Sequence, residues 1–145
     1  MNLFGMLQLS GSALSAERQR AEVVTSNMAN AETTRTPEGG PYRRKLVVFR
    51  SQQEPRFPMM LTAGWRSLNQ PGVQVAQVVE DTSPPEMRYE PGSPDANAQG
   101  FVAYPNVNPV NEMVDLLGAV RAYELNSSAV QATKQMIQQS IDLLR

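Results

Sequence analysis

The sequence predicts an α+β protein in which long N- and C-terminal helices pair as an antiparallel coiled coil around a small β-rich central domain. Both ends carry apolar residues at intervals of three, four and seven, the spacing of a helix that packs on another helix. All 11 prolines lie between Pro37 and Pro109. Short β-branched runs bounded by turn residues occupy this middle part. The predicted domains are residues 1–34 and 108–145, which form the inner helical domain, and residues 35–107, which form the central domain.

The N-terminal helix is predicted from about Leu3 to Ala31. Apolar side chains recur along one face of this segment, and we expect them to supply its half of an assembly seam. These residues are Leu3, Leu7, Leu14, Val24 and Met28. Asn27 and Asn30 lie near the end of the pattern, where Asn side chains often satisfy backbone groups. A simple helix stop is the plainest interpretation of both.

The C-terminal helix is predicted from Pro109 to Arg145, with Asn108 as its N-cap. Its apolar residues form two rows at sevenfold spacing, and we expect both rows to belong to the assembly seam. The first row is Leu116, Tyr123, Val130, Ile137 and Leu144, and the second contains Met113, Val120 and Ile141. Glu112 and Asp115 lie near the positive end of the helix dipole. We interpret them as partners of that dipole and not as metal ligands.

Four short segments of the central part are predicted to be β-strands that form a small antiparallel sheet. They are Tyr42–Phe49, Val73–Val79, Met87–Tyr89 and Phe101–Tyr104. The first of them contains Arg43, Arg44 and Lys45, which we interpret as a solvated strand edge that discourages wrong pairing.

The composition excludes several classes of function. The chain of 145 residues has no cysteine, no histidine and a net charge of −1, so thiol and imidazole chemistry is absent. No cationic face for nucleic acid and no apolar run of the ~18 residues of a membrane span is present. No catalytic constellation, cofactor motif or metal site is found. The first residues lack the basic and apolar regions of a secretory signal peptide.

Three motif-bearing segments carry a close resemblance to the bacterial flagellar basal-body rod proteins, specifically the proximal-rod protein C type. The first joins Asn27-Met28-Ala29-Asn30-Ala31 to Gly40-Pro41-Tyr42-Arg43, and the second is Tyr89-Glu90-Pro91-Gly92-Ser93-Pro94-Asp95-Ala96. The third runs from Tyr104-Pro105-Asn106-Val107-Asn108 through Glu112-Met113-Val114-Asp115 to Arg121-Ala122-Tyr123-Glu124 and Asn126. The residues that match the family motifs are Asn27, Asn30, Tyr42, Pro105, Asn106, Asn108, Glu112, Met113, Arg121, Tyr123 and Asn126.

The resemblance implies a structural subunit that is no enzyme and needs no cofactor. Its terminal helices would self-assemble into a helical tube that transmits torque, as part of the rod that crosses the periplasm. The implied partners are copies of itself, other rod and adaptor subunits, and the flagellar type III export apparatus. Two alternatives remain at this stage. One is a secreted coiled-coil structural or effector protein outside the flagellum, and the other is a cell-wall hydrolase, which the missing catalytic base disfavours.

Overall fold

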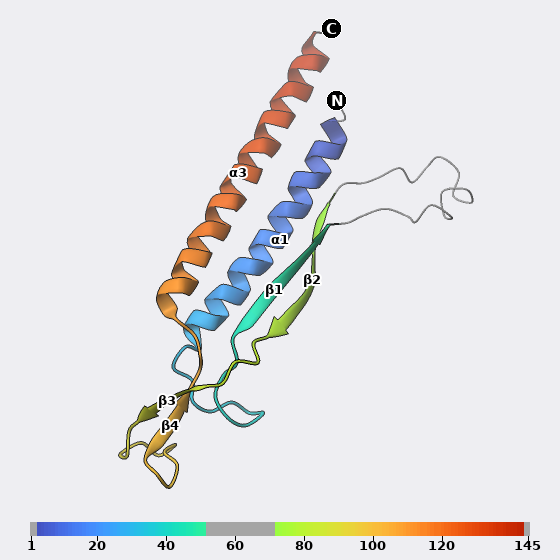
Figure 1. Cartoon of the computed structure of the whole chain (residues 1–145). Coiled ribbons are helices and arrows are strands. Elements are labelled where there is room, and N and C mark those ends of the chain that lie inside the picture. The colour runs from blue at the N-terminus through green and yellow to red at the C-terminus, as the bar shows by residue number, and fades with distance from the viewer. Residues whose placement is uncertain (1–2, 52–71, 144–145) are drawn as a thin grey trace, which may run out of the picture. The chain divides into compact units, whose positions relative to one another are not determined.

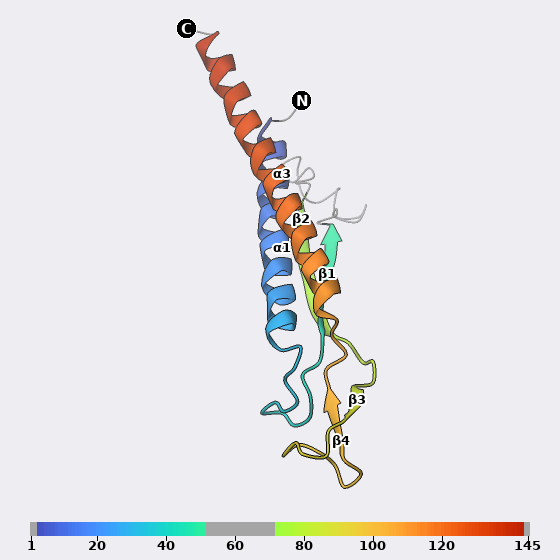
Figure 2. The ribbon, with the colours of Figure 1, turned by 90° about the vertical axis from the view of Figure 1, so that its left-hand side faces the viewer.

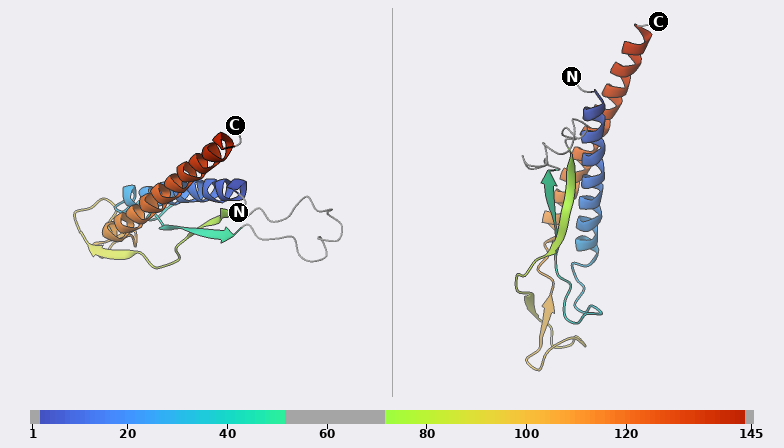
Figure 3. Two further views of the ribbon diagram at one scale, coloured as in Figure 1. Left: turned by 90° about the horizontal axis from the view of Figure 1, so that it is seen from above. Right: turned by 90° about the vertical axis from the view of Figure 1, so that its right-hand side faces the viewer.

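The computed structural model describes residues 3–51 and 72–143 and has the predicted α+β class (Figure 1). Its elements, in chain order, are α1 (Leu3–Ala29), β1 (Lys45–Ser51), β2 (Val73–Glu80), β3 (Glu86–Tyr89), β4 (Phe101–Tyr104) and α3 (Pro109–Asp142). Both helices run without a break (Figure 3). Leu144, the last residue of the predicted first row, lies outside the described residues.

Helix α1 begins at Leu3 as predicted but ends at Ala29, two residues earlier than predicted. Asn30 causes this end. Its backbone N–H donates to the carbonyl of Ser26 over 3.1 Å, and its side-chain Nδ2 donates to the same oxygen over 2.9 Å. The hydroxyl of Thr33 then donates to Asn30 Oδ1 over 3.2 Å. The side chain therefore takes over hydrogen bonding where the helical ladder stops.

Helix α3 starts at Pro109, and the predicted N-cap is confirmed. Asn108 Oδ1 accepts hydrogen bonds from the backbone N–H groups of Val110 (2.9 Å) and Asn111 (3.4 Å). These are two of the donors that a helix start leaves without partners. The helix ends at Asp142, earlier than predicted, and residues 144–145 lie outside the described part.

The four strands form two separate two-stranded sheets, β1–β2 and β3–β4, where the sequence predicts one sheet. Among the described residues, strands β3 and β4 pair with each other alone, antiparallel, with Glu86 opposite Tyr104 and Tyr89 opposite Phe101 (Figure 2). Strand β1 begins at Lys45 and not at Tyr42. The β-branched segments KLVVFRS and VQVAQVVE suit the extended backbone of β1 and β2.

The chain divides into two compact units, each of which contains part of α1 and part of α3. The first unit contains residues 1–19, 49–76 and 119–145, and the second contains residues 20–48 and 77–118. In the first unit, the backbone N–H of Val73 donates to Ser12 Oγ over 3.0 Å, which ties the start of β2 to α1. The domain boundaries proposed from the sequence stay a prediction.

Among the described residues, few side chains are buried, and several of them are polar. Those of the first unit are Ala16, Ala119 and Thr133, and those of the second are Val24, Asn27, Val102, Pro105 and Glu112. Many large apolar side chains, in contrast, are exposed. A chain with this distribution has little apolar core of its own, so its apolar surface remains available to other proteins.

Candidate functional site

The most buried residues of helix α3 form a row that belongs to neither of the two predicted rows. Glu112, Ala119 and Thr133 are each 1% exposed, and Asn126, at the same sevenfold spacing, is half-buried. This row lies one position before the predicted second row. The predicted row is exposed at each of its members, which are Met113, Val120 and Ile141.

The remaining seam residues are mostly covered within the chain. Val24 is buried, while Leu3, Leu7, Leu14 and Met28 on α1 are half-buried. On α3, Leu116, Val130 and Ile137 are half-buried, whereas Tyr123 is exposed. That these residues form a seam between subunits stays a prediction.

One face of α3 is apolar and exposed along its first three turns. We name this set the outer apolar face, and its members are Val110, Met113, Val114, Leu117 and Val120. Their spacing of three, four, seven and ten residues places them on one side of the helix, opposite Glu112 and Ala119. Val110 is 67% exposed, whereas Glu112 is 1% exposed. Over its first three turns, α3 therefore exposes an apolar face and buries the carboxylate of Glu112 on the opposite side.

The covered side of α3 begins at a hydrogen-bonded cluster that we name the polar junction. Its members are Asn27, Tyr42, Arg44, Glu112 and Asp115, with the backbone of Lys45. Asn27, near the end of α1, is 1% exposed. Its Nδ2 donates to the Lys45 carbonyl (2.8 Å) and to Glu112 Oε2 (3.0 Å), and its Oδ1 accepts from Lys45 N–H (2.9 Å) and Tyr42 Oη (3.0 Å). The amide thus uses both donors and both acceptor positions.

Glu112 is the buried charge of the polar junction, and Arg44 neutralises it. Both Nε and Nη2 of Arg44 lie 2.6 Å from Glu112 Oε1. Arg44 Nη2 also lies 3.5 Å from Asp115 Oδ2, and Arg20 Nη2 lies 3.5 Å from Asp115 Oδ1. A buried carboxylate is tolerable only when charge and hydrogen bonds compensate its desolvation. The junction supplies both.

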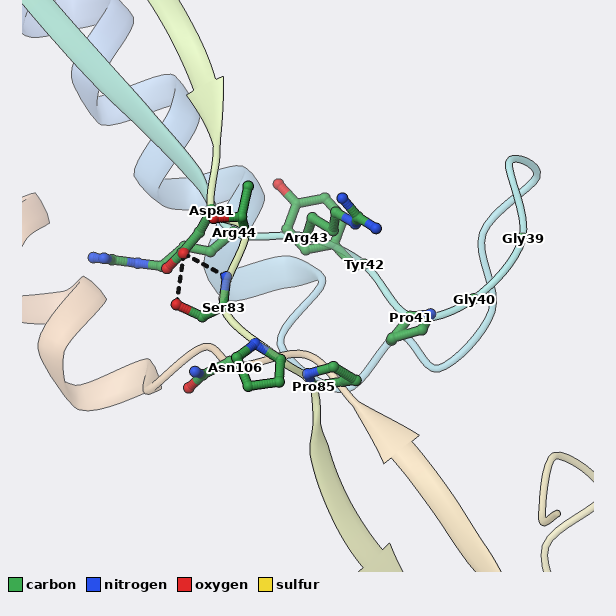
Figure 4. Close-up of a pocket in the computed structure, with 12 residues that line it drawn as sticks. Gly39, Gly40, Pro41, Tyr42, Arg43, Arg44, Asp81, Ser83, Pro85 and Asn106 are labelled. Atoms are coloured by element: carbon green, nitrogen blue, oxygen red, sulfur yellow. Dashed lines mark hydrogen bonds between the residues drawn. The ribbon is translucent and has the colours of Figure 1, made fainter.

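Two interpretations of these residues from sequence are wrong. Asn27 is no simple helix stop, because its side chain binds β1 and α3. Glu112 does lie in the first turn of α3, as its interpretation as a partner of the helix dipole requires, and it also pairs with Arg44. Arg44 is no solvated edge residue, since its side chain and that of Arg43 extend to opposite sides of the chain (Figure 4). In an extended segment, successive side chains point to opposite sides. This alternation was the signal in the sequence that Arg43 and Arg44 have different surroundings.

The other family-motif residues lie outside the polar junction. Pro105 is buried, and Asn106 is exposed at the edge of a hollow of about 230 Å³ beside Tyr42 and Arg44 (Figure 4). On α3, Arg121 is exposed, and Asn126 Nδ2 donates to the carbonyl of Ala122 over 2.9 Å.

The hollow contains no catalytic machinery. Asp81 Oδ1 accepts hydrogen bonds from the hydroxyl (2.7 Å) and the backbone N–H (2.9 Å) of Ser83. These bonds, that from the hydroxyl first, hold the pKa of Asp81 below its ordinary value. A carboxylate with a lowered pKa is a weak base for activating the hydroxyl beside it. The hydrogen bonds between Asp81 and Ser83 therefore stabilise a turn.

Two further searches concern the described residues alone. Within residues 3–51 and 72–143, no group of three or more acidic, His or Cys side chains is placed to hold a metal ion. No helix in this described part is long and apolar enough to cross a membrane.

An apolar face exposed at the start of a terminal helix and a small core among the described residues are typical of assembly subunits. Comparison with known proteins agrees. The model of the "Flagella basal body rod protein" family matches residues 7–35, and that of the "Flagellar basal body rod FlgEFG protein C-terminal" family matches residues 98–143.

Whole-chain relatives give the particular family. The chain is 42% identical to the flagellar basal-body rod protein FlgC of Bacillus subtilis, with 99% of each chain covered. It is 38% identical to FlgC of Borreliella burgdorferi (100% of this chain and 99% of the relative) and 40% identical to FlgC of Escherichia coli O157:H7 (99% and 98%). The chain belongs to the FlgC family of flagellar basal-body rod proteins. It is a structural subunit of the proximal rod and not an enzyme.

Proposed function

We propose that the subunit assembles through helix surfaces that its own fold leaves uncovered. In each copy, α1 and α3 pair antiparallel, and the polar junction holds them in register. Two contacts support this pairing, those of Asn27 with Glu112 and of Arg20 with Asp115. The residue numbers rise along α3 as they fall along α1, which is the order that an antiparallel pair requires. A buried polar contact is the usual device that specifies register between helices.

The outer apolar face of α3 carries this proposal. Its five side chains are 42–67% exposed in the single chain. Covering apolar surface stabilises a contact by about 25 cal/mol per Å², so this face favours packing against a neighbouring subunit. At the start of α3, polar contacts thus hold the helix to its own chain, and apolar contacts would hold it to others.

The partners that we propose are copies of this chain and other rod and adaptor subunits. The subunits would stack into the helical tube that crosses the periplasm and transmits torque. We further propose that the flagellar type III apparatus exports the chain.

Charged substitutions on the outer apolar face test the proposal. Leu117→Asp and Met113→Asp should leave the circular-dichroism spectrum of the purified chain unchanged, since both positions are solvent-exposed. In cells that lack the natural protein, both variants should fail to enter purified basal bodies, and swimming should be lost. Ser128→Asp, at an exposed polar position on the same helix, is the matched control and should assemble. Normal incorporation of the two apolar-face variants would exclude this face as an assembly surface.

A further inference from the structure

Helix α3 leaves largely exposed an apolar stripe that a packed helix ordinarily covers. The stripe consists of Met113, Leu116, Val120 and Tyr123, whose spacings of three and four residues place them on one side of the helix. Met113 is 52% exposed, Val120 is 42% exposed and Tyr123 is 44% exposed, while Leu116 is half-buried. If burial of apolar surface alone decided how α3 packs, this stripe would face the rest of the chain.

The row that α3 covers instead lies one residue away from this stripe. Glu112 and Ala119 are each 1% exposed, and Asn126 is half-buried. One residue corresponds to a rotation of about 100° around the helix axis. The observed arrangement of α3 therefore differs by a single step of rotation from a second one, the turned arrangement, in which the apolar stripe would be covered.

The polar residues further along the covered row do not distinguish the two arrangements. Asn126 Nδ2 donates to the carbonyl of Ala122 over 2.9 Å, and the hydroxyl of Thr133 donates to the carbonyl of Ala129 over 2.8 Å. Both side chains thus bond to their own helix, and these bonds turn with it. Neither residue ties α3 to a particular rotation.

Glu112 is the residue of the covered row that other segments bind. Asn27 Nδ2, from α1, donates to Glu112 Oε2 over 3.0 Å, and Nε and Nη2 of Arg44 both lie 2.6 Å from Glu112 Oε1. A rotation of α3 by about 100° would carry the carboxylate away from both partners. Asn27 is itself 1% exposed, so the broken bond would leave a buried donor without its acceptor.

We propose that the ion pair of Glu112 with Arg44 is a rotational lock of α3. It selects the side of the helix that the chain covers and thereby keeps Met113 and Val120, on the outer apolar face, uncovered for neighbouring subunits. Without the lock, α3 turns and the chain covers its own apolar stripe. Buried polar contacts specify one helix arrangement over another in the same way in coiled coils. This inference rests on the proposed function and adds to it the residues that select the assembly-competent arrangement.

Replacing the ion pair by apolar side chains tests the lock. The double variant Arg44→Met/Glu112→Leu removes both charges, so that no buried ion is left without its partner. The chain has no cysteine, so a single introduced thiol reports on one position. Met113→Cys marks the apolar stripe. Leu125→Cys is the control position, because Leu125 is 72% exposed and lies about 120° from Met113 around the helix, away from the covered side in both arrangements.

The measurement is the rate at which a polar maleimide labels each thiol in the purified chains. With the natural ion pair, both thiols should react at comparable rates. In the Arg44→Met/Glu112→Leu background, labelling of Met113→Cys should slow about tenfold or more, while that of Leu125→Cys should stay unchanged. Destabilisation alone cannot produce this result, because it exposes thiols and does not protect them.

The exposed ion pair of Arg88 with Glu86 supplies the matched control. Its side chains are 46% and 58% exposed, and Arg88→Met/Glu86→Leu should leave both labelling rates unchanged. The inference is wrong if Met113→Cys keeps its labelling rate in the Arg44→Met/Glu112→Leu chain.

If the Arg44→Met/Glu112→Leu chain loses its helical circular-dichroism signal, Arg44→Leu/Glu112→Met replaces it with apolar side chains of other shapes. Loss of the helical signal in both chains also overturns the inference, because the turned arrangement has to fold.

Incorporation into basal bodies separates this inference from the proposed function. In cells that lack the natural protein, the Arg44→Met/Glu112→Leu chain without cysteine should be missing from purified basal bodies, and the Arg88→Met/Glu86→Leu chain should enter them. If labelling of Met113→Cys slows but the first chain still enters basal bodies, the lock is supported, and the outer apolar face is overturned as an assembly surface.

Discussion

The side chain of Asn27 binds the backbone of Lys45 as a neighbouring strand would. Its Nδ2 donates to the Lys45 carbonyl, and its Oδ1 accepts from the Lys45 N–H. A helix residue thus satisfies both backbone groups at the first residue of β1, and the same Nδ2 reaches Glu112 on α3. One amide connects three segments of the second unit, so its chemistry determines several consequences for stability.

Replacing Asn27 by Asp should be strongly destabilising. Aspartate cannot donate to the Lys45 carbonyl. Its second carboxylate oxygen would take the place of Asn27 Nδ2, about 3 Å from the carboxylate of Glu112, so that two negative charges would be in contact. We expect a loss of about 3 kcal/mol or more in the free energy of unfolding, measured by urea denaturation. Asn30→Asp is the control, because it removes one hydrogen bond worth about 1 kcal/mol. Equal effects of the two substitutions would contradict the central role of Asn27.

Arg44 and Glu112 should be strongly coupled. Arg44→Ala leaves a buried carboxylate without its cation, which typically costs 3–5 kcal/mol, whereas the double variant Arg44→Ala/Glu112→Ala removes both charges. A double-mutant cycle should therefore give a coupling energy above about 1 kcal/mol.

The exposed pair Arg88–Glu86 is the matched control for this cycle, since its side chains are 46% and 58% exposed. Its coupling energy should lie between about 0 and 1 kcal/mol. A larger coupling for the exposed pair than for Arg44–Glu112 would show that burial is not what makes the ion pair of the polar junction important.

Alanine at Gly100 should destabilise the β3–β4 hairpin. Gly100 has φ = +81° and lies against the Tyr89 ring, so alanine suffers both backbone strain and a steric clash. We expect a loss of more than about 1–2 kcal/mol in unfolding free energy. Gly39→Ala, at φ = +92° with open space around it, should show the strain alone. Gly118 lies within α3, and a Cβ added there would have no atom within 4 Å. Gly118→Ala should therefore stabilise the chain by about 1 kcal/mol, the difference in helix propensity between the two residues.

The turn at Asp81 should lose its stabilising effect in acid. The pKa of Asp81 is lowered in the folded chain by the hydrogen bonds from Ser83, so its contribution is complete above the ordinary value of 3.8. This contribution disappears as the pH falls through the lower folded value. The difference in unfolding free energy between the natural chain and Asp81→Ala should thus be constant near neutral pH and should shrink in acid. If the difference in unfolding free energy grew on acidification, the pKa of Asp81 would be raised in the folded chain and not lowered, which would contradict this prediction.

The two half-buried residues Val130 and Ile137 test the seam predicted from the sequence. Val130→Asp and Ile137→Asp place a charge on the covered side of α3 and should abolish incorporation into basal bodies. The second unit does not contain either residue and should stay folded, as judged by the near-ultraviolet signal of its tyrosines. Normal incorporation of both variants would refute the seam.

The sequence by itself determined the helices, because their signals are local. The N-cap Asn108, the proline at the first helical position and the apolar periods act within a few residues of one another, so α3 starts where predicted. The family motifs are also local strings, and the relatives confirm the family that they indicate.

Only the tertiary structure decided which side of α3 is covered. Rows that start at Glu112 and at Met113 lie about 100° apart on a helix, and apolar spacing cannot tell a contact within the chain from a contact with a neighbour. The fold covers the more polar row because Arg44 and Asn27, from distant parts of the sequence, compensate Glu112 there. The apolar row is left outside, where we propose that neighbouring subunits bind.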